Sequence, residues 1–159
     1  MQKITPFLWF DTQAEAAADF YTSVFPDSKI TNVQRYGDAG PGPAGTAMIV
    51  QFTAAGTEFT ALNGGPVHAA FTEAISFQVD CRDQAEVDEY WEKLTADGGE
   101  PGPCGWLKDK YGLSWQIVPA ALSELLSDPD PGRAGRAMQA MLTMQKIEVQ
   151  ALRDAADAG

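Results

Sequence analysis

His68 and Cys104 are the first candidates in this sequence for acid, base or nucleophilic chemistry. His68 is the only histidine, so the chain has no two-histidine metal face and at most one imidazole base. It follows Pro66 in a predicted loop, where a solvated histidine is the commoner outcome. Cys104 becomes a nucleophile where a nearby cation lowers its pKa, and Lys108 or Lys110 can approach it. A cysteine in a strand is more often a small buried apolar residue. Cys104 is nevertheless a candidate catalytic residue, although the sequence identifies no general base beside it.

Three tryptophans, Trp9, Trp106 and Trp115, fall on predicted strands. Tryptophan offers a broad apolar surface with one N–H donor, which suits a flat ligand, so all three are candidate ligand-binding residues. The alternative is that their rings fill the core beneath the helices. Phe7 and Trp9 share one face of the first strand, and Leu8 and Phe10 share the other. Because both faces are apolar, both sides of this sheet must be covered.

Composition excludes several partner classes. The chain has 159 residues, with 22 acidic and 11 basic side chains and a formal net charge of −11. This charge repels a nucleic-acid backbone, and no cluster of basic residues interrupts it. No apolar stretch near the start approaches the roughly 20 residues of a membrane span. The two cysteines cannot make a disulfide framework and suit a reducing compartment. We therefore expect a cytoplasmic globular protein that binds neither nucleic acid nor membrane.

The first half of the chain has the pattern strand, helix, three strands. An apolar stretch over residues 3–10 predicts the first strand. Thr12 precedes Glu15 by three residues, which is the spacing of a capping box that starts a helix. Pro26 and Asp27 end this helix. Further strands are predicted over residues 29–36, 46–53 and 57–62, followed by a Gly-rich turn over residues 63–66.

The second half repeats this order. A strand is predicted over residues 74–80, and Asp83 precedes Glu86 in a second capping box. The helix that follows ends at Gly98 and Gly99. Short strands are predicted over residues 104–108 and 113–118, with a third across 100–103. The sequence Gln-Ala-Glu occurs at residues 13–15 and again at 84–86, which indicates an internal duplication.

The tail after residue 120 is predicted to be helical, with a break over residues 127–132 where two prolines forbid a continuous helix. Met138, Met141, Leu142 and Met144 give it an apolar face that has no evident place in the two halves. We expect this face to pack across the halves or against a second chain. The predicted parts are a first module over residues 1–66, a second over 67–119 and a helical extension over 120–159.

Two βαβββ modules resemble the vicinal oxygen chelate superfamily, which includes glyoxalase I, bleomycin-resistance proteins and extradiol dioxygenases. The resemblance is closest to its PhnB-like family and covers about residues 3–150. It is carried by the motifs Leu8-Trp9-Phe10-Asp11, Phe25-Pro26-Asp27-Ser28, Leu62-Asn63-Gly64-Gly65-Pro66, Cys104-Gly105-Trp106 and Gly112-Leu113-Ser114-Trp115-Gln116-Ile117. It implies an α+β fold in which the two modules form a cupped mixed sheet, with the C-terminal helices added.

Some PhnB-like sequences carry the label 3-demethylubiquinone-9 3-methyltransferase. A methyltransferase of the usual doubly wound type needs a Gly-rich turn between its first strand and helix. Here the two strand-to-helix junctions are Asp11-Thr12 and Asp80-Cys81-Arg82-Asp83, which read as helix caps. The label is therefore not expected to describe the activity.

The metal enzymes of this superfamily hold a divalent ion with histidine and glutamate ligands from four strands. The resemblance places those four positions at Ile4, Phe59, Ala74 and Gln116. Isoleucine, phenylalanine and alanine have no electron pair to share, and a single amide oxygen does not hold a transition metal against water. We therefore expect no metal at the inherited site.

A shift of one residue in the strand register gives a different expectation. Glu58 and Glu73 would then replace Phe59 and Ala74, with His68 nearby, and a divalent metal could bind. A one-residue slip exchanges the two faces of a strand, so the two registers are sharply distinct.

The remaining candidates are amides. Gln116 lies where the superfamily has its last acidic ligand and can hydrogen bond to a ligand carbonyl without a metal. Asn63, at the end of the last strand of the first module, can do the same or can serve the turn. The expected function is metal-free binding of a small molecule by a homodimer. The alternatives are a metal-dependent lyase or dioxygenase, a transferase acting through Cys104, and a purely structural module that has no pocket beside Trp115 and Gln116.

Overall fold

The computed structural model describes residues 2–67 and 70–159. The chain divides into two compact units, Met1–Ala69 and Ala70–Gly159, and each has its own sheet. The three C-terminal helices belong to the same unit as the second sheet. His68 lies outside the described residues.

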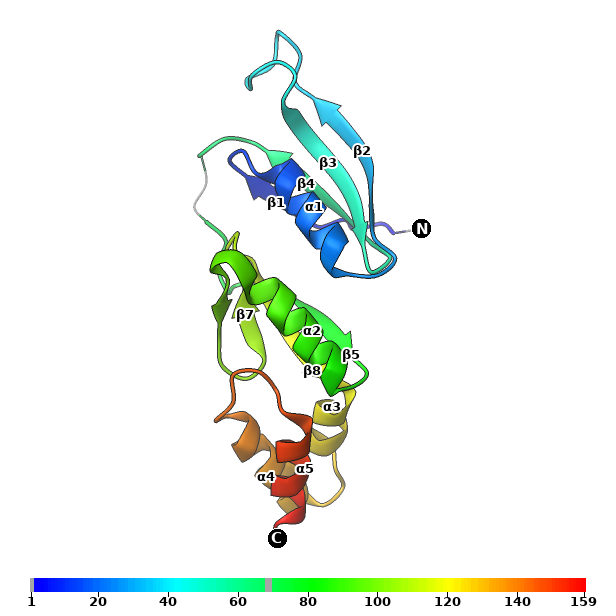
Figure 1. Cartoon of the computed structure of the whole chain (residues 1–159), viewed down its shortest axis with the longest axis vertical. Helices are drawn as coiled ribbons and strands as arrows, with labels where there is room; N and C mark the ends of the chain where they lie inside the picture. Colours follow the sequence, from blue (N-terminus) through cyan, green and yellow to red (C-terminus); the bar gives the residue numbers. More distant parts are fainter. Residues whose placement is uncertain (1, 68–69) are drawn as a thin grey trace. The chain divides into compact units, whose positions relative to one another are not determined.

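The first unit is built from β1 (Phe7–Phe10), α1 (Ala14–Val24), β2 (Lys29–Arg35), β3 (Ala47–Ala54) and β4 (Thr57–Asn63). Its sheet has the order β1-β4-β3-β2, in which β1 and β4 are parallel and the other pairs antiparallel. Helix α1 lies along one face of this sheet (Figure 1). The core stacks Tyr21 of α1 on Phe52 of β3, with ring centroids 6.0 Å apart, and Phe52 on Phe59 of β4 at 5.4 Å.

The second unit repeats this plan with β5 (Ser76–Cys81), α2 (Gln84–Thr95), the 3-10 turn η1 (Ala96–Gly98), β6 (Glu100–Pro101), β7 (Trp106–Lys108) and β8 (Ser114–Pro119). The order β5-β8-β7-β6, with β5 parallel to β8, matches that of the first sheet. The predicted α+β fold of two βαβββ modules is confirmed, and the matching sheets fit an internal duplication.

The two helix starts differ from each other. The Asp83 cap predicted for α2 is present, because its side chain accepts from the amide of Glu86 at 3.0 Å, while the Glu86 carboxylate accepts from the amide of Arg82 at 2.9 Å instead of from that of Asp83. The box predicted from Thr12 and Glu15 is wrong. The N-cap residue of α1 is Gln13, which makes no side-chain cap. Glu15 pairs instead with Arg35 at 3.0 Å, so its carboxylate is used elsewhere.

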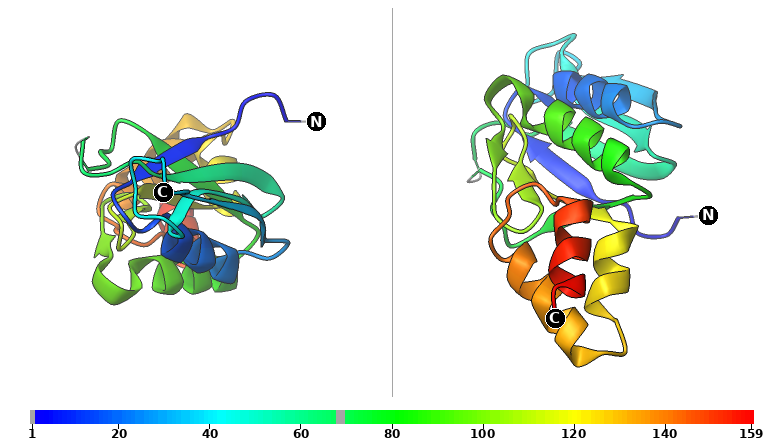
Figure 2. Two further views of the ribbon diagram at one scale, coloured as in Figure 1. Left: turned by 90° about the horizontal axis from the view of Figure 1, so that it is seen from above. Right: turned by 60° about the horizontal axis from the view of Figure 1, so that its bottom comes forward.

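Helices α3 (Ala120–Leu126), α4 (Pro131–Met141) and α5 (Val149–Asp157) pack side by side at the end of the second unit (Figure 2). Their core is formed by Leu122, Ile147 and Leu152, with Met141 and Met144 packed against it. Met141 and Met144, which belong to the apolar face predicted to need a partner, are therefore covered within this unit. Met138 and Leu142 remain exposed, at 40% and 62%. Within the described residues, no helix is long and apolar enough to cross a membrane.

Candidate functional site: a pocket on the second sheet

The second sheet has one face covered by α2 and one face turned away from it. Strand alternation places Leu107, Trp115 and Ile117 on the α2 side, where all three are buried. The residues that alternate with them, together with Ser76, Gln78 and Asp80 of β5, form the other face. On this face Trp106 is paired with Gln116, and Lys108 with Ser114.

A pocket of about 580 Å³ opens on this second face. Residues of β6, β7 and β8, the turn between β6 and β7, and the loop before β5 supply its walls. All of the lining residues belong to the second unit: Glu73, Glu100, Pro101, Gly102, Pro103, Cys104, Trp106, Leu107, Lys108 and Ser114. The pocket therefore needs no contribution from the first unit.

Ser114 is the most informative of these residues. Its side chain is 1% exposed, and its Oγ atom makes no hydrogen bond within the described part of the chain. Leaving a buried hydroxyl unpaired costs roughly 1–3 kcal/mol, so such a group in a native fold calls for an explanation. Ser114 is also one of the residues that line the pocket.

The charges around the pocket are arranged unevenly. Lys108 forms an ion pair with Glu73, and this hydrogen bond raises the pKa of Lys108 and lowers the pKa of Glu73. Glu100 lies directly across the β6–β7 ladder from Lys108. Its carboxylate makes no ion pair or side-chain hydrogen bond with any described residue. The lining therefore carries two acidic groups and one base, which disfavours an anionic ligand.

Cys104 lies in a tight turn between β6 and β7, which corrects its predicted place on a strand. The amide of Trp106 donates to the carbonyl of Pro103 at 3.0 Å, and the two central residues, Cys104 and Gly105, have φ of 57° and 86°. Positive φ at both positions is typical of a type I′ hairpin turn, which twists with the strands. The turn places the half-buried Cys104 in the pocket wall.

Two predicted ligand-binding residues lie away from the pocket. Trp115 is 4% exposed beneath α2, and its Nε1 donates to Asp109 Oδ2 at 2.9 Å. The structural interpretation of this ring, as core, therefore fits its position. Gln116 is on the same face as Trp106, but its Nε2 atom donates to Ser76 Oγ at 2.9 Å and it does not line the pocket.

The two predicted residues of the first unit have local partners. Asn63 Oδ1 accepts from the amide of Ala14 at 2.8 Å, and Asn63 Nδ2 donates to the carbonyl of Ala47 at 3.0 Å. Asn63 thus supplies from β4 the cap that α1 lacks locally. Trp9 lies on the face opposite α1, and its Nε1 donates to the carbonyl of Gly65 at 2.9 Å. Its ring covers Gly64 so closely that a Cβ atom there would lie 2.1 Å from it.

The residues at the inherited metal positions do not fit a metal ion. Phe59 is 7% exposed under α1, so the face opposite α1 carries Glu58 and Thr60 instead. The backbone of Glu58 is held by Gln2, and the carboxylate of Glu73 is engaged by Lys108. Among the residues that the structure describes, no three His, Cys, Asp or Glu side chains are grouped so that they could hold a metal.

Ser114 and Glu100 are not among the site residues predicted from the sequence, although the pattern of the strand does place Ser114. Ser114 is two residues from Gln116 on a predicted strand, so the same alternation that placed Gln116 also places Ser114 on that face. Glu100 carries no such signal, because β6 has only two residues.

A protein family described as 3-demethylubiquinone-9 3-methyltransferase matches residues 2–118. Among solved structures, a PhnB protein from Bacillus cereus described by the same activity is similar to this chain. The two share 41% sequence identity and a TM-score of 0.68, over 75% of this chain and all of the other. A protein from Pseudomonas aeruginosa is 18% identical with a TM-score of 0.62, over 75% of this chain and 98% of the other.

The fosfomycin resistance protein FosX from Listeria monocytogenes is 16% identical with a TM-score of 0.56, over 80% of this chain and 98% of the other. At this level of identity the similarity shows the fold alone. No curated protein matches the chain.

Proposed function

The chain belongs to the PhnB-like family described as 3-demethylubiquinone-9 3-methyltransferase, within the glyoxalase and bleomycin-resistance superfamily, and we propose that it binds a small organic molecule without a metal ion. The proposed site is the pocket on the second sheet. One observation carries the proposal: Ser114 lines the pocket together with Trp106, and its hydroxyl is buried without a hydrogen-bond partner among the described residues. A ligand that supplies the missing hydrogen bond removes the cost of burying this hydroxyl.

The lining of the pocket indicates the class of ligand. Trp106, Leu107, Pro101 and Pro103 supply apolar walls, and a volume of about 580 Å³ lies in the range that holds a small organic molecule. The indole ring of Trp106 favours a flat or aromatic group. The acidic balance of Glu73, Glu100 and Lys108 favours a neutral or cationic molecule over an anion.

The family description alone does not support methyl transfer for this chain. Each sheet has a single parallel pair, whereas the usual methyltransferase sheet is doubly wound. The junctions before α1 and α2 are occupied by helix caps instead of a Gly-rich phosphate-binding turn. A fold supports many activities, and the site must decide among them.

The metal-free part of the proposal has its own test. It is supported by the poor donor set at the inherited positions and by the engagement of Glu73 with Lys108. Elemental analysis of protein purified without chelators is expected to find Zn, Ni, Mn and Fe far below one equivalent. One equivalent of any of these ions would favour the metal-dependent lyase or dioxygenase instead.

The binding site is tested with indole and indene, which have the same ring skeleton. Indole has an N–H that Ser114 Oγ can accept, and indene has a CH₂ at that position. Saturation-transfer NMR is expected to show tighter binding of indole than of indene by about threefold to tenfold, as one hydrogen bond is worth roughly 0.5–1.5 kcal/mol. Ser114→Ala should abolish this difference, and Trp106→Ala should weaken both ligands.

The matched control is Trp91→Ala, because Trp91 lies on α2 and does not line the pocket. It should leave both affinities unchanged. If neither compound binds the wild-type protein, or if Trp91→Ala weakens them as much as Trp106→Ala does, the proposed site is wrong.

We further propose that the protein is a homodimer whose second copy covers exposed apolar side chains. Phe7 is 58% exposed on the face opposite α1, and Leu142 is 62% exposed after α4. Covering such side chains contributes about 25 cal/mol per Å² of apolar surface. Sedimentation velocity at micromolar concentration is expected to give a species of twice the 17.1 kDa chain mass. A species of the chain mass alone would contradict this part.

A further inference from the structure

The family match ends at residue 118, so the three C-terminal helices lie beyond it. The segment between α4 and α5 does more than join two helices. It returns to the second sheet and contacts the turn that carries Cys104. We call residues 144–149 the C-terminal strap, and we propose that this strap positions the turn wall of the ligand pocket. The inference rests on the proposed function, because the pocket is the proposed binding site.

The first contact is made between main chains. The amide of Cys104 donates to the carbonyl of Met144 at 2.8 Å, and the amide of Gly105 donates to the carbonyl of Gln145 at 2.7 Å. These are the two central residues of the type I′ turn, whose amides are not used by the hairpin itself. The strap therefore accepts the two donors that the turn leaves free.

The turn needs such support because of its backbone conformation. A left-handed conformation is unfavourable for a residue other than glycine, and Cys104 adopts it with φ of 57°. At the adjacent position, a Cβ atom added to Gly105 would lie 3.1 Å from Ile147 Cγ1 and 3.1 Å from the carbonyl oxygen of Ile117. The strap thus packs on the turn as closely as glycine permits.

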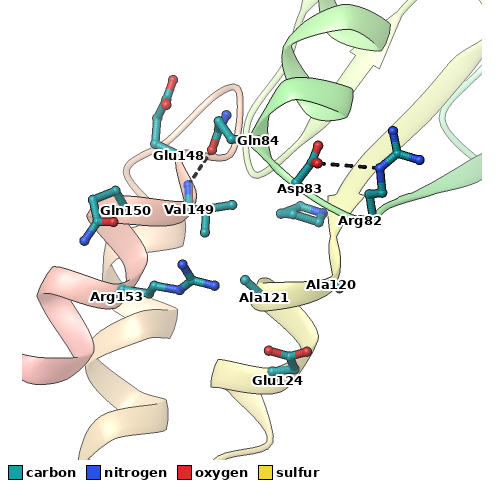
Figure 3. A pocket seen from close by; sticks show the side chains of 11 residues that line it. Arg82, Asp83, Gln84, Ala120, Ala121, Glu124, Glu148, Val149, Gln150 and Arg153 are labelled. Carbon is teal, nitrogen blue, oxygen red and sulfur yellow. Dashed lines mark hydrogen bonds and ion pairs between the residues drawn. The ribbon is translucent and has the colours of Figure 1, made fainter.

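The second contact anchors the strap to α2. Gln84, the first residue of α2, donates from Nε2 to the carbonyl of Ile147 at 2.9 Å and accepts at Oε1 from the amide of Val149 at 2.7 Å. Figure 3 shows the bond between Gln84 and Val149. Figure 3 labels Gln84 among the residues that line a second pocket. This pocket has a volume of about 320 Å³. One side-chain amide therefore pairs with two main-chain groups of the strap, as another strand would.

A third contact fixes the middle of the strap. Lys146 Nζ lies 2.7 Å from Asp88 Oδ1 on α2, and this hydrogen bond lowers the pKa of Asp88. Ile147, next in the chain, is fully buried in the core of the C-terminal helices. The strap is thus held by α2 and by this core, and it holds the pocket wall in turn. Gln84 is a positioning residue in this arrangement, since it does not itself line the pocket.

The test compares Gln84→Ala with Gln150→Ala in the full chain. Gln150 is an exposed residue of α5 whose Nε2 atom donates to Asp154, and its side chain does not hold the strap. We expect Gln84→Ala to speed hydrogen exchange of the Cys104 and Gly105 amides by tenfold or more. Exchange of the Asp109 amide, which donates to Leu113 and does not contact the strap, should not change. Gln150→Ala should change none of the three.

The link to the pocket is tested by indole binding in the same variants. Gln84→Ala is expected to weaken indole by threefold or more, and Gln150→Ala to leave it unchanged. Unchanged exchange at the two turn amides in Gln84→Ala would overturn the inference. Faster exchange with unchanged indole affinity would overturn it as well. Failure of indole to bind the wild-type protein is a separate result, which removes the proposed function before any variant is made.

A second variant covers the case in which Gln84→Ala does not fold. Lys146→Ala removes the pair with Asp88, and Lys93→Ala removes the similar pair of Lys93 with Glu89, 2.6 Å apart on the surface of α2. Lys146→Ala should speed exchange at Cys104 and Gly105, whereas Lys93→Ala should not. Equal behaviour of these two variants would contradict the role of the strap.

Discussion

The carboxylate of Asp109 accepts the indole N–H of Trp115 at 2.9 Å, and both side chains are buried. The other oxygen of this carboxylate accepts from the amides of Tyr111 and Leu113, at 2.8 and 3.1 Å. One side chain therefore holds the β7–β8 turn and the position of the Trp115 ring together.

Asp109→Ala is expected to lower the free energy of unfolding by about 2–4 kcal/mol, because it leaves the Trp115 N–H and two amides buried without an acceptor. Chemical denaturation followed by tryptophan fluorescence measures this loss. Asp154→Ala is the matched control, since Asp154 is exposed and accepts only from Gln150 among the side chains. A loss below about 0.5 kcal/mol for Asp109→Ala would show that water replaces the carboxylate.

Asn63→Ala should destabilise the first unit by about 1–2 kcal/mol, which is the usual cost of removing a helix cap. Thr12→Ala should change stability by less than about 0.5 kcal/mol, because Thr12 makes no side-chain cap. Thermal or urea unfolding of the two variants measures both effects. A larger loss of stability in Thr12→Ala than in Asn63→Ala would support the local capping box predicted from the sequence.

Ser114→Ala is expected to leave the unliganded protein as stable as the wild type or up to about 1 kcal/mol more stable, because it removes a buried hydroxyl that makes no hydrogen bond with a described residue. Ser28→Ala provides the contrast. Ser28 Oγ accepts from the amide of Ala55 at 2.9 Å and donates to the carbonyl of Pro26, so its loss should cost stability. A clear destabilisation by Ser114→Ala, measured by urea unfolding, would mean that the hydroxyl has a partner in solution.

The two cysteines should differ in reactivity. Desolvation, together with the nearby charges of Glu86 and Asp80, raises the pKa of Cys81 to about 12. At pH 8 its thiol is therefore protonated and buried, whereas Cys104 lies half-buried in the pocket wall. Iodoacetamide is expected to label Cys104 first and Cys81 only on unfolding, as read by peptide mass spectrometry. Labelling of Cys81 in the folded protein at the rate of Cys104 would contradict this.

The raised pKa of Cys81 also predicts a loss of stability in alkali. The folded protein keeps this proton more tightly than the unfolded chain does, so the contribution is complete below about pH 9 and falls as the pH rises toward 12. Burial also raises the pKa of Tyr90, which adds to the fall. Cys81→Ala should therefore reduce the decline in unfolding free energy between pH 8 and 10.5 without abolishing it. An identical decline in wild type and variant would remove Cys81 from the explanation.

The fold was predictable because its signals are local and occur twice. Alternating apolar residues and Gly-rich turns define each module without reference to distant contacts. The start of α1 could not be predicted in the same way. Its cap comes from Asn63, 49 residues after Ala14, and depends on the parallel pairing of β1 with β4.

The site was less predictable, because the faces of apolar strands look alike in sequence. Leu113, Trp115 and Ile117 are all apolar and buried, and the strand carries Ser114 and Gln116 between them. Only the position of α2 shows whether the three apolar residues or Ser114 and Gln116 lie on the pocket side of the strand. The Trp115 ring lies on the α2 side of the sheet, where its N–H donates to Asp109. No rule of sequence spacing predicts a hydrogen bond between these two residues.

The strap meets the turn through carbonyl oxygens, which every amino acid carries. The exposed Gln145 can therefore be replaced without loss of this contact, whereas Met144 also packs against the core of the C-terminal helices. Gly105 has less latitude, because its φ of 86° strains any other residue and a Cβ atom there would lie 3.1 Å from Ile147 Cγ1 and from the carbonyl oxygen of Ile117. Substitutions meant to change the ligand preference of the proposed pocket should therefore keep Gly105 and alter Trp106 and the residues that face it.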